Sequence, residues 1–162
     1  MKPLIVLLIV FVISLITLRI IKATYEVAQS GVIAMSMMLI FTAIGHFAFT
    51  KGMSMMLPKF IPFKVSIVYL TGVFEIVLAI GLLVPKFRYI TGWALIVFLL
   101  LLLPANIYAA INHVNIQKGT FDGNGPAYLW FRIPLQILFI AWAYFSVLRA
   151  DLFTNVVKYA HN

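Results

Sequence analysis

The chain has 162 residues, of which 64% are hydrophobic and 10% charged, and its mean hydropathy is +1.11. Soluble domains are about half apolar and about a quarter charged, so this chain has too few charges to cover a surface that faces water. Length and composition therefore exclude a soluble globular enzyme and predict a single membrane domain. The net charge of +8 does not indicate nucleic acid, because the bases fall between apolar runs and form no basic face.

Five long apolar runs follow one another along the chain, at Pro3 to Leu18, Val32 to Phe49, Val65 to Val84, Tyr89 to Ile111 and Tyr128 to Leu148. The last four have the roughly 17–25 residues with which a helix crosses a bilayer, and the first reaches that length if Arg19 extends to the headgroups. The runs lack the alternation of a membrane β-barrel. We therefore predict an all-α bundle of five transmembrane helices, a multi-pass membrane protein.

The first run resembles a signal peptide in its position and length. Only Lys2 precedes it, however, and no small-residue cleavage site follows it. We expect a helix that is retained in the mature protein.

The segment between the second and third runs, residues 50–64, is rich in methionine and proline. Its two prolines prevent a continuous helix, while its other residues are too apolar for a free loop. We expect an interfacial loop or lid formed by Met53, Met55, Met56, Pro58 and Pro62. The tetrapeptide Met-Ser-Met-Met occurs here and at residues 35–38, and thioethers suit Cu(I). Packing is the better interpretation, so we predict no metal site.

Strong polar side chains are rare within the runs; they are His46, Glu75, Asn106, Arg132 and Gln136. A helix rises about 1.5 Å per residue, which converts sequence position into depth. Counted from the ends that carry segments 50–64 and 119–126, Glu75 lies about 15 Å deep and the other four lie nearer the surface. All five therefore fall in one half of the bilayer, on four different helices, which predicts a single polar centre.

Glu75 and Arg132 are the only formal charges inside the runs, and they have opposite signs. Because an isolated charge in hydrocarbon costs at least about 2.5–3.5 kcal/mol, we expect them to pair, directly or through Gln136, His46 or water. Such a pair can have a purely structural role, in which it only fixes the register of the helices. Ionisable groups inside membranes are functional candidates by default, which favours a pocket where Arg132 and His46 meet a polar or anionic head.

His46 taken alone is typical of a hydrogen-bonded histidine at a helix end. A haem between His46 and His113 is a geometric alternative with no other support in the sequence. Cysteine is absent, which excludes disulfides, a thiol relay, thiolate-bound zinc, iron–sulfur ligation and covalent haem attachment. No Ser/His/Asp arrangement, paired carboxylate, glycine-rich phosphate loop or HExxH motif is present. The sequence therefore favours a protein that is not an enzyme and leaves its cofactor unidentified.

Several short segments, in their order and spacing, resemble the DoxX family of small bacterial membrane proteins. They are IGHF (44–47), MLP (56–58) with Pro62, YLTGVFE (69–75), GLLVPKFR (81–88), PANIYAA (104–110) and YLWFRIPLQILFIAW (128–142). The resemblance covers about residues 31–148. It implies a four-helix core over 31–148, an added N-terminal helix and connector at 1–30, and a short polar tail at 149–162. The polar motif positions of the family would fall on the five residues already identified by depth.

DoxX-like proteins include a subunit linked to thiosulfate:quinone oxidoreduction and others tied to redox complexes or to the maturation of redox enzymes. The resemblance implies an accessory membrane protein whose polar centre binds a small amphipathic molecule, with a quinone as the concrete candidate. Its partners would be the lipid bilayer, that ligand and membrane redox-complex subunits. Two alternatives stay open: an assembly subunit without a ligand of its own, and a transporter of a small solute or soft metal, for which no inverted repeat is visible.

Overall fold

The computed structural model describes residues 2–149, and all of its regular elements are helical. In chain order they are α1 (Lys2–Lys22), α2 (Val27–Ala48), α3 (Thr50–Ser54), α4 (Lys64–Leu83), α5 (Arg88–Ile111), the 3₁₀ turn η1 (Pro126–Tyr128), α6 (Leu129–Ala143) and the π-helical η2 (Tyr144–Arg149). Five helices are long and apolar enough to cross a membrane, with η1, α6 and η2 counted as one. The predicted all-α bundle is confirmed. The predicted tail lies outside the described residues except for Arg149.

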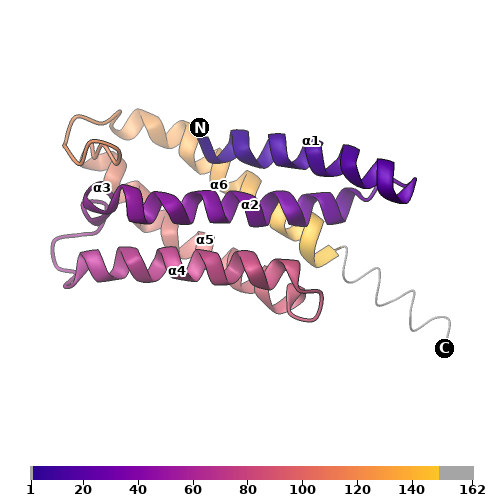
Figure 1. Ribbon diagram of the computed structural model, residues 1–162. Helices are drawn as coiled ribbons and strands as arrows, with labels where there is room; N and C mark the ends of the chain where they lie inside the picture. The colour runs from indigo at the N-terminus through magenta and orange to yellow at the C-terminus, as the bar shows by residue number, and fades with distance from the viewer. Residues whose placement is uncertain (1, 150–162) are drawn as a thin grey trace.

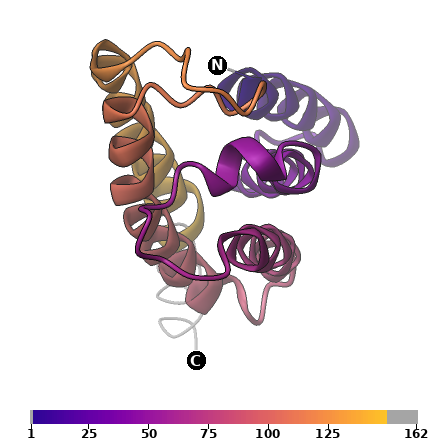
Figure 2. The ribbon, with the colours of Figure 1, turned by 90° about the vertical axis from the view of Figure 1, so that its left-hand side faces the viewer.

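The long helices run roughly alongside one another in two layers (Figures 1 and 2). Seen from the end, α1, α2 and α4 form one layer, and α5 and α6 form the other (Figure 2). The helix α2 contacts α1 and α4 on its two sides and reaches the second layer through α6 and η2. It is therefore the central helix, and it carries ten buried residues where α1 carries two.

Local chemistry explains where the helices stop. Val84 precedes Pro85 and adopts an extended conformation, as a residue before proline prefers, which ends α4. The α3–α4 connection places Phe63, just after Pro62, at a φ of 52°, and α4 begins at the next residue. The helix bounds otherwise agree with the predicted runs to within a few residues, except that α1 extends to Lys22 and α2 starts at Val27.

The short helix α3 and the loop 112–125 close one end of the bundle, which we call the α3 end (Figure 1). A Cβ atom on Gly52 would lie 1.9 Å from the carbonyl oxygen of Ile116, so only glycine allows α3 to approach the loop this closely. The aliphatic part of Lys51 packs on Gly119 in the same way. The sequence predicted neither α3 nor this contact.

The last predicted run is not one regular helix. After Ala143 the chain widens into η2, where the Ser146 hydroxyl donates to the Trp142 carbonyl. The indole of Trp142 donates to the Gly31 carbonyl at 3.1 Å, and a Cβ on Gly31 would lie 2.5 Å from the Cβ of Ser146. This close contact joins the second layer to α2 at the end opposite α3.

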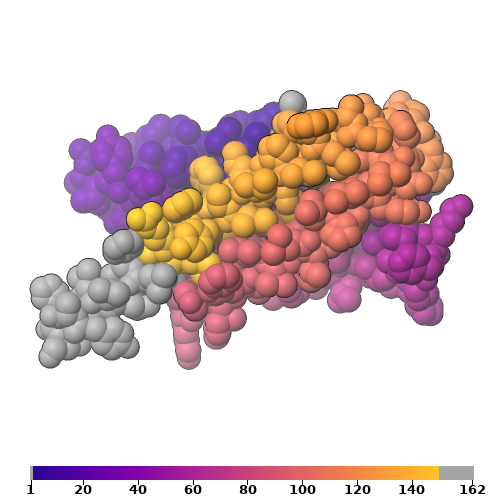
Figure 3. Space-filling view, turned by 180° about the vertical axis from the view of Figure 1, so that it is seen from behind, coloured from indigo at the N-terminus to yellow at the C-terminus, as the bar shows by residue number. Residues whose placement is uncertain are grey.

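Apolar side chains fill the interior and also cover the outside. Leu7, Met35 and Leu95 are fully buried, whereas Ile20, Leu70 and Leu101 are 78%, 69% and 71% exposed. Figure 3 shows α6 and η2 running diagonally between α1 and α5, so α6 also presents one face to the surroundings. A continuous apolar exterior of this kind is unusual for a protein surrounded by water.

Candidate functional site

A buried ion pair joins α2 to α4. The Nε2 atom of His46 lies 3.5 Å from the Oε1 atom of Glu75, and the two residues are 9% and 4% exposed. His46 occupies the last turn of α2 at the α3 end, and Glu75 lies in the middle of α4. A carboxylate buried this deeply requires a partner, because its desolvation is expensive. His46 supplies that partner.

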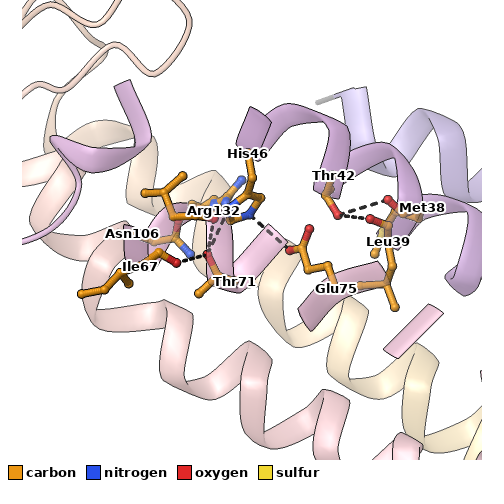
Figure 4. A network of polar contacts seen from close by, with 10 residues as sticks. Met38, Leu39, Thr42, His46, Ile67, Thr71, Glu75, Asn106 and Arg132 are labelled. Atoms are coloured by element: carbon orange, nitrogen blue, oxygen red, sulfur yellow. Dashed lines mark hydrogen bonds and ion pairs between the residues drawn. The ribbon is translucent and has the colours of Figure 1, made fainter. Parts of the chain in front are cut away.

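The other ring nitrogen of His46 is also engaged. Its Nδ1 atom lies 3.0 Å from the Val68 carbonyl oxygen and 3.1 Å from the Thr71 hydroxyl oxygen, both on α4 (Figure 4). The Thr71 hydroxyl is also within 3.0 Å of the Ile67 carbonyl, to which it can donate. Because a carbonyl oxygen only accepts hydrogen bonds, the Nδ1 atom carries a proton. The ring is thus fixed at both nitrogens.

The close approach of α2 and α4 at this point depends on a glycine. A Cβ on Gly72 would lie 2.8 Å from the Cβ of His46 and 3.3 Å from its Cγ, closer than side chains normally pack. The structure thus places His46 directly against Gly72.

Substituting Gly72→Ala is therefore expected to lower the free energy of unfolding by about 1–3 kcal/mol through overpacking. The matched control is Gly45→Ala, whose Cβ would make only an ordinary 3.6 Å contact with the Met53 methyl group. Alanine is the better helix former, so the control should be neutral or stabilising. Thermal unfolding in one detergent measures both variants, and equal stability of the two would contradict the assigned contact.

A second polar pair joins α5 to α6. The Nη2 atom of Arg132 donates to the Oδ1 atom of Asn106 at 3.0 Å, and Arg132 is half-buried while Asn106 is 8% exposed. Gln136, one turn further along α6, donates through Nε2 to the Leu99 carbonyl at 2.5 Å. That carbonyl is one residue from Leu100, whose carbonyl loses its helical donor because Pro104 has no N–H group. Polar side chains thus join the helices at both positions.

The direct pairing of Glu75 with Arg132 is not found. Among the described residues Glu75 pairs with His46, and Arg132 bonds to Asn106. Figure 4 shows both pairs in one part of the bundle, with Arg132 and Asn106 on one side of His46 and Glu75 on the other. The reason is geometric: the ring of His46 reaches Glu75 from the helix that packs directly on α4, and Asn106 lies on the helix that packs on α6.

Two further residues, Thr42 and Thr71, belong to the site and were not predicted from the sequence. Thr42 lies one helical turn before His46, and in Figure 4 the carboxylate of Glu75 lies between them. Its hydroxyl approaches the Met38 carbonyl at 3.2 Å and the Leu39 carbonyl at 2.9 Å. The four-residue spacing of Thr42 and His46, which puts both on one face of α2, was the signal that could have found it.

The predicted lid residues do not form one buried surface. Met53, Met55, Met56 and Pro58 are half-buried, whereas Pro62 is exposed and its neighbour Phe63 is 81% exposed. Met53 packs toward Gly45, beside His46. In the part of the chain that the structure describes, no group of three or more His, Asp or Glu side chains gathers as a metal site would require. His113 lies exposed in the loop 112–125.

Two apolar grooves open on the surface of the part of the chain that the structure describes. One, of about 350 Å³, is lined by five residues of η1 and α6 that include Trp130. The other, of about 520 Å³, lies between α1, α2, α6 and η2, beside Phe11 and Trp142, whose rings meet edge to face at 5.0 Å. None of the five predicted site residues lines either groove.

Within residues 2–149, the fold and the site together define an all-helical bundle of five long apolar helices, with one polar pair between α2 and α4 and another between α5 and α6. A family model matches residues 35–147, and the chain belongs to that family, a domain of unknown function (DUF8561). The match begins within α2 and ends within η2, so it contains both polar pairs and leaves out α1. No curated protein and no solved structure matches the chain.

Proposed function

We propose that this chain is a multi-pass protein of the bacterial cytoplasmic membrane with a DoxX-like four-helix core over residues 31–148. Its five apolar helices have the length that a bilayer requires, and their outer faces carry exposed apolar side chains. In this proposal α3 and the loop 112–125 lie on one side of the membrane, and the turn between α4 and α5 lies on the other. The helix α1 packs outside the proposed core.

Within that core we propose a binding site for a small amphipathic molecule of the quinone type. The observation that supports this proposal is how few acceptors the guanidinium of Arg132 has. A guanidinium has five N–H donors, and among the described residues this half-buried one has a single side-chain acceptor, Asn106. Arginine in an apolar bundle normally pairs fully or reaches a polar group outside the chain, so the remaining donors favour an oxygen-bearing head from the membrane.

The contacts assign a part to each side chain. Arg132 would donate to an oxygen of the ligand, and Asn106 holds the guanidinium in place. His46 is not a ligand donor in this arrangement, because Val68 and Glu75 engage both of its ring nitrogens. Gln136 fixes α6 against α5 below Arg132. The methionines of the lid would cover the site from the α3 end. The protein would serve as an accessory component of a redox process.

A role as an assembly subunit is the second candidate. The groove of about 520 Å³ between α1, α2 and η2 is apolar and open, as a partner helix would require. It lies away from Arg132, so the two candidates involve different surfaces.

Mass spectrometry of the small molecules that co-purify with the protein tests the binding proposal. We expect one species in stoichiometric amount with the native chain and at least about tenfold less with Arg132→Leu, because a hydrogen bond to a charged group contributes about 1.5–3 kcal/mol. Lys86→Leu removes a positive charge from the exposed turn at the opposite end and is the matched control. A stoichiometric protein partner without any small molecule would favour assembly instead.

A further inference from the structure

One buried oxygen in the polar centre has no hydrogen-bond partner among residues 2–149. It is the Oε2 atom of Glu75, in a side chain that is only 6% exposed. Its neighbour Oε1 faces His46, so one oxygen of the carboxyl group has a polar partner and the other, although buried, has none. Buried polar atoms without partners are rare and each one calls for a cause, because such an atom costs free energy comparable to a lost hydrogen bond.

The proton count of the pair shows what Oε2 can do. His46 carries a proton on Nδ1, which points to the Val68 carbonyl. A second proton between Nε2 and Oε1 makes their 3.5 Å contact attractive, whereas without it two lone pairs would face each other. With the proton in this place the pair has no net charge, and Oε2 keeps its lone pairs and can only accept.

The surroundings of Oε2 supply no donor. In Figure 4 the carboxylate of Glu75 points toward Thr42. The Thr42 hydroxyl has the carbonyls of Met38 and Leu39 to donate to, so its oxygen also offers only lone pairs to the centre. An ammonium ion would add a buried charge beside a pair that is already neutral, which is costly. An uncharged hydroxyl group satisfies the oxygen without adding charge.

We propose that the ligand of the polar centre is recognised as an uncharged hydrogen-bond donor, through a hydroxyl group that donates to the Oε2 atom of Glu75. This inference rests on the proposed binding function and narrows it to the hydroxyl-bearing, reduced form of a quinone-like molecule. A quinone offers carbonyl oxygens alone, so it leaves this atom unpaired. Arg132 binds either form, because a hydroxyl oxygen also accepts.

The experiment compares a decyl-substituted hydroquinone with its dimethyl ether, which keeps the ring and the tail and lacks both donors. Equilibrium binding is measured with the full chain in lipid nanodiscs under argon. The native protein should bind the hydroquinone about tenfold to a hundredfold more tightly than the ether, the range for a hydrogen bond to a charged group. In Glu75→Leu the two affinities should become equal. Glu75→Gln should still bind the hydroquinone more tightly than the ether, because the glutamine amide can donate to His46 and turn its oxygen to the ligand.

Each outcome bears on a different step. Equal binding of both probes by the native protein would overturn the donor inference and leave the binding site standing. A preference that persists in Glu75→Leu would overturn the role of Glu75. Binding of neither probe above empty nanodiscs would overturn the proposed function and this inference with it. Arg132→Leu should weaken the binding of both probes by the same factor. This result distinguishes the contact made by Arg132 from the contact made by Glu75.

Discussion

Replacing His46 with leucine is expected to lower the free energy of unfolding by about 3–5 kcal/mol, the cost of removing one partner from a buried ion pair. The loss is large because the carboxyl group of Glu75, which is 4% exposed, would lose the His46 ring that is its partner among the described residues. Glu75→Leu should cost much less, since it leaves a neutral imidazole that still donates to the Val68 carbonyl. The double variant should recover most of the stability lost in His46→Leu.

Unfolding of the four proteins in one detergent mixture completes the double-mutant cycle. The expected sign is a strong favourable coupling between the two positions. Equal costs for the two single variants, with a double variant equal to their sum, would show that the pair does not act as a unit.

Cysteine labelling is expected to give an all-or-none pattern, and the absence of native cysteine makes every single-cysteine variant unambiguous. Asn124→Cys and Lys59→Cys, both exposed at the α3 end, should react with an impermeant maleimide from the same side of intact membranes. Lys86→Cys, exposed in the turn at the other end, should react only from the opposite side.

Leu101→Cys supplies the sharper comparison. Leu101 lies midway along α5 and is 71% exposed, so a protein surrounded by water would present it to the reagent. In a bilayer the thiol stays protonated and unreactive, because the reaction needs the thiolate. Labelling of Leu101→Cys in intact membranes, or of Asn124→Cys and Lys86→Cys from one side, would contradict the proposed topology.

Long apolar runs predicted the helices well because backbone hydrogen bonding within an apolar chain leaves few alternatives to a helix. Depth along those runs also brought out the polar residues that the structure places near the α3 end. Depth did not predict which of these polar side chains pair with one another. Whether Glu75 meets Arg132 or His46 depends on which helices pack together, and a single sequence does not contain that information. The contact between Gly72 and His46, which decides it, joins positions 26 residues apart.

The other omissions have local causes. The helix α3 is five residues long and contains a glycine, so its composition resembles a loop. Its place depends on the contact of Gly52 with Ile116, between segments far apart in the sequence. The π-helical turn η2 leaves hydropathy unchanged and therefore leaves no trace in the pattern. That the Oε2 atom of Glu75 has no partner depends on where the surrounding donors lie, which a single sequence does not contain.

The most direct test of the central claim is a crystal structure of the protein purified from its native membranes without added ligand. We expect density for a small molecule within hydrogen-bond distance of the Arg132 guanidinium, with a polar atom directed at the Oε2 atom of Glu75. A structure in which Arg132 instead swings to Glu75 and closes the centre as an ion pair, with no molecule between them, would contradict the account.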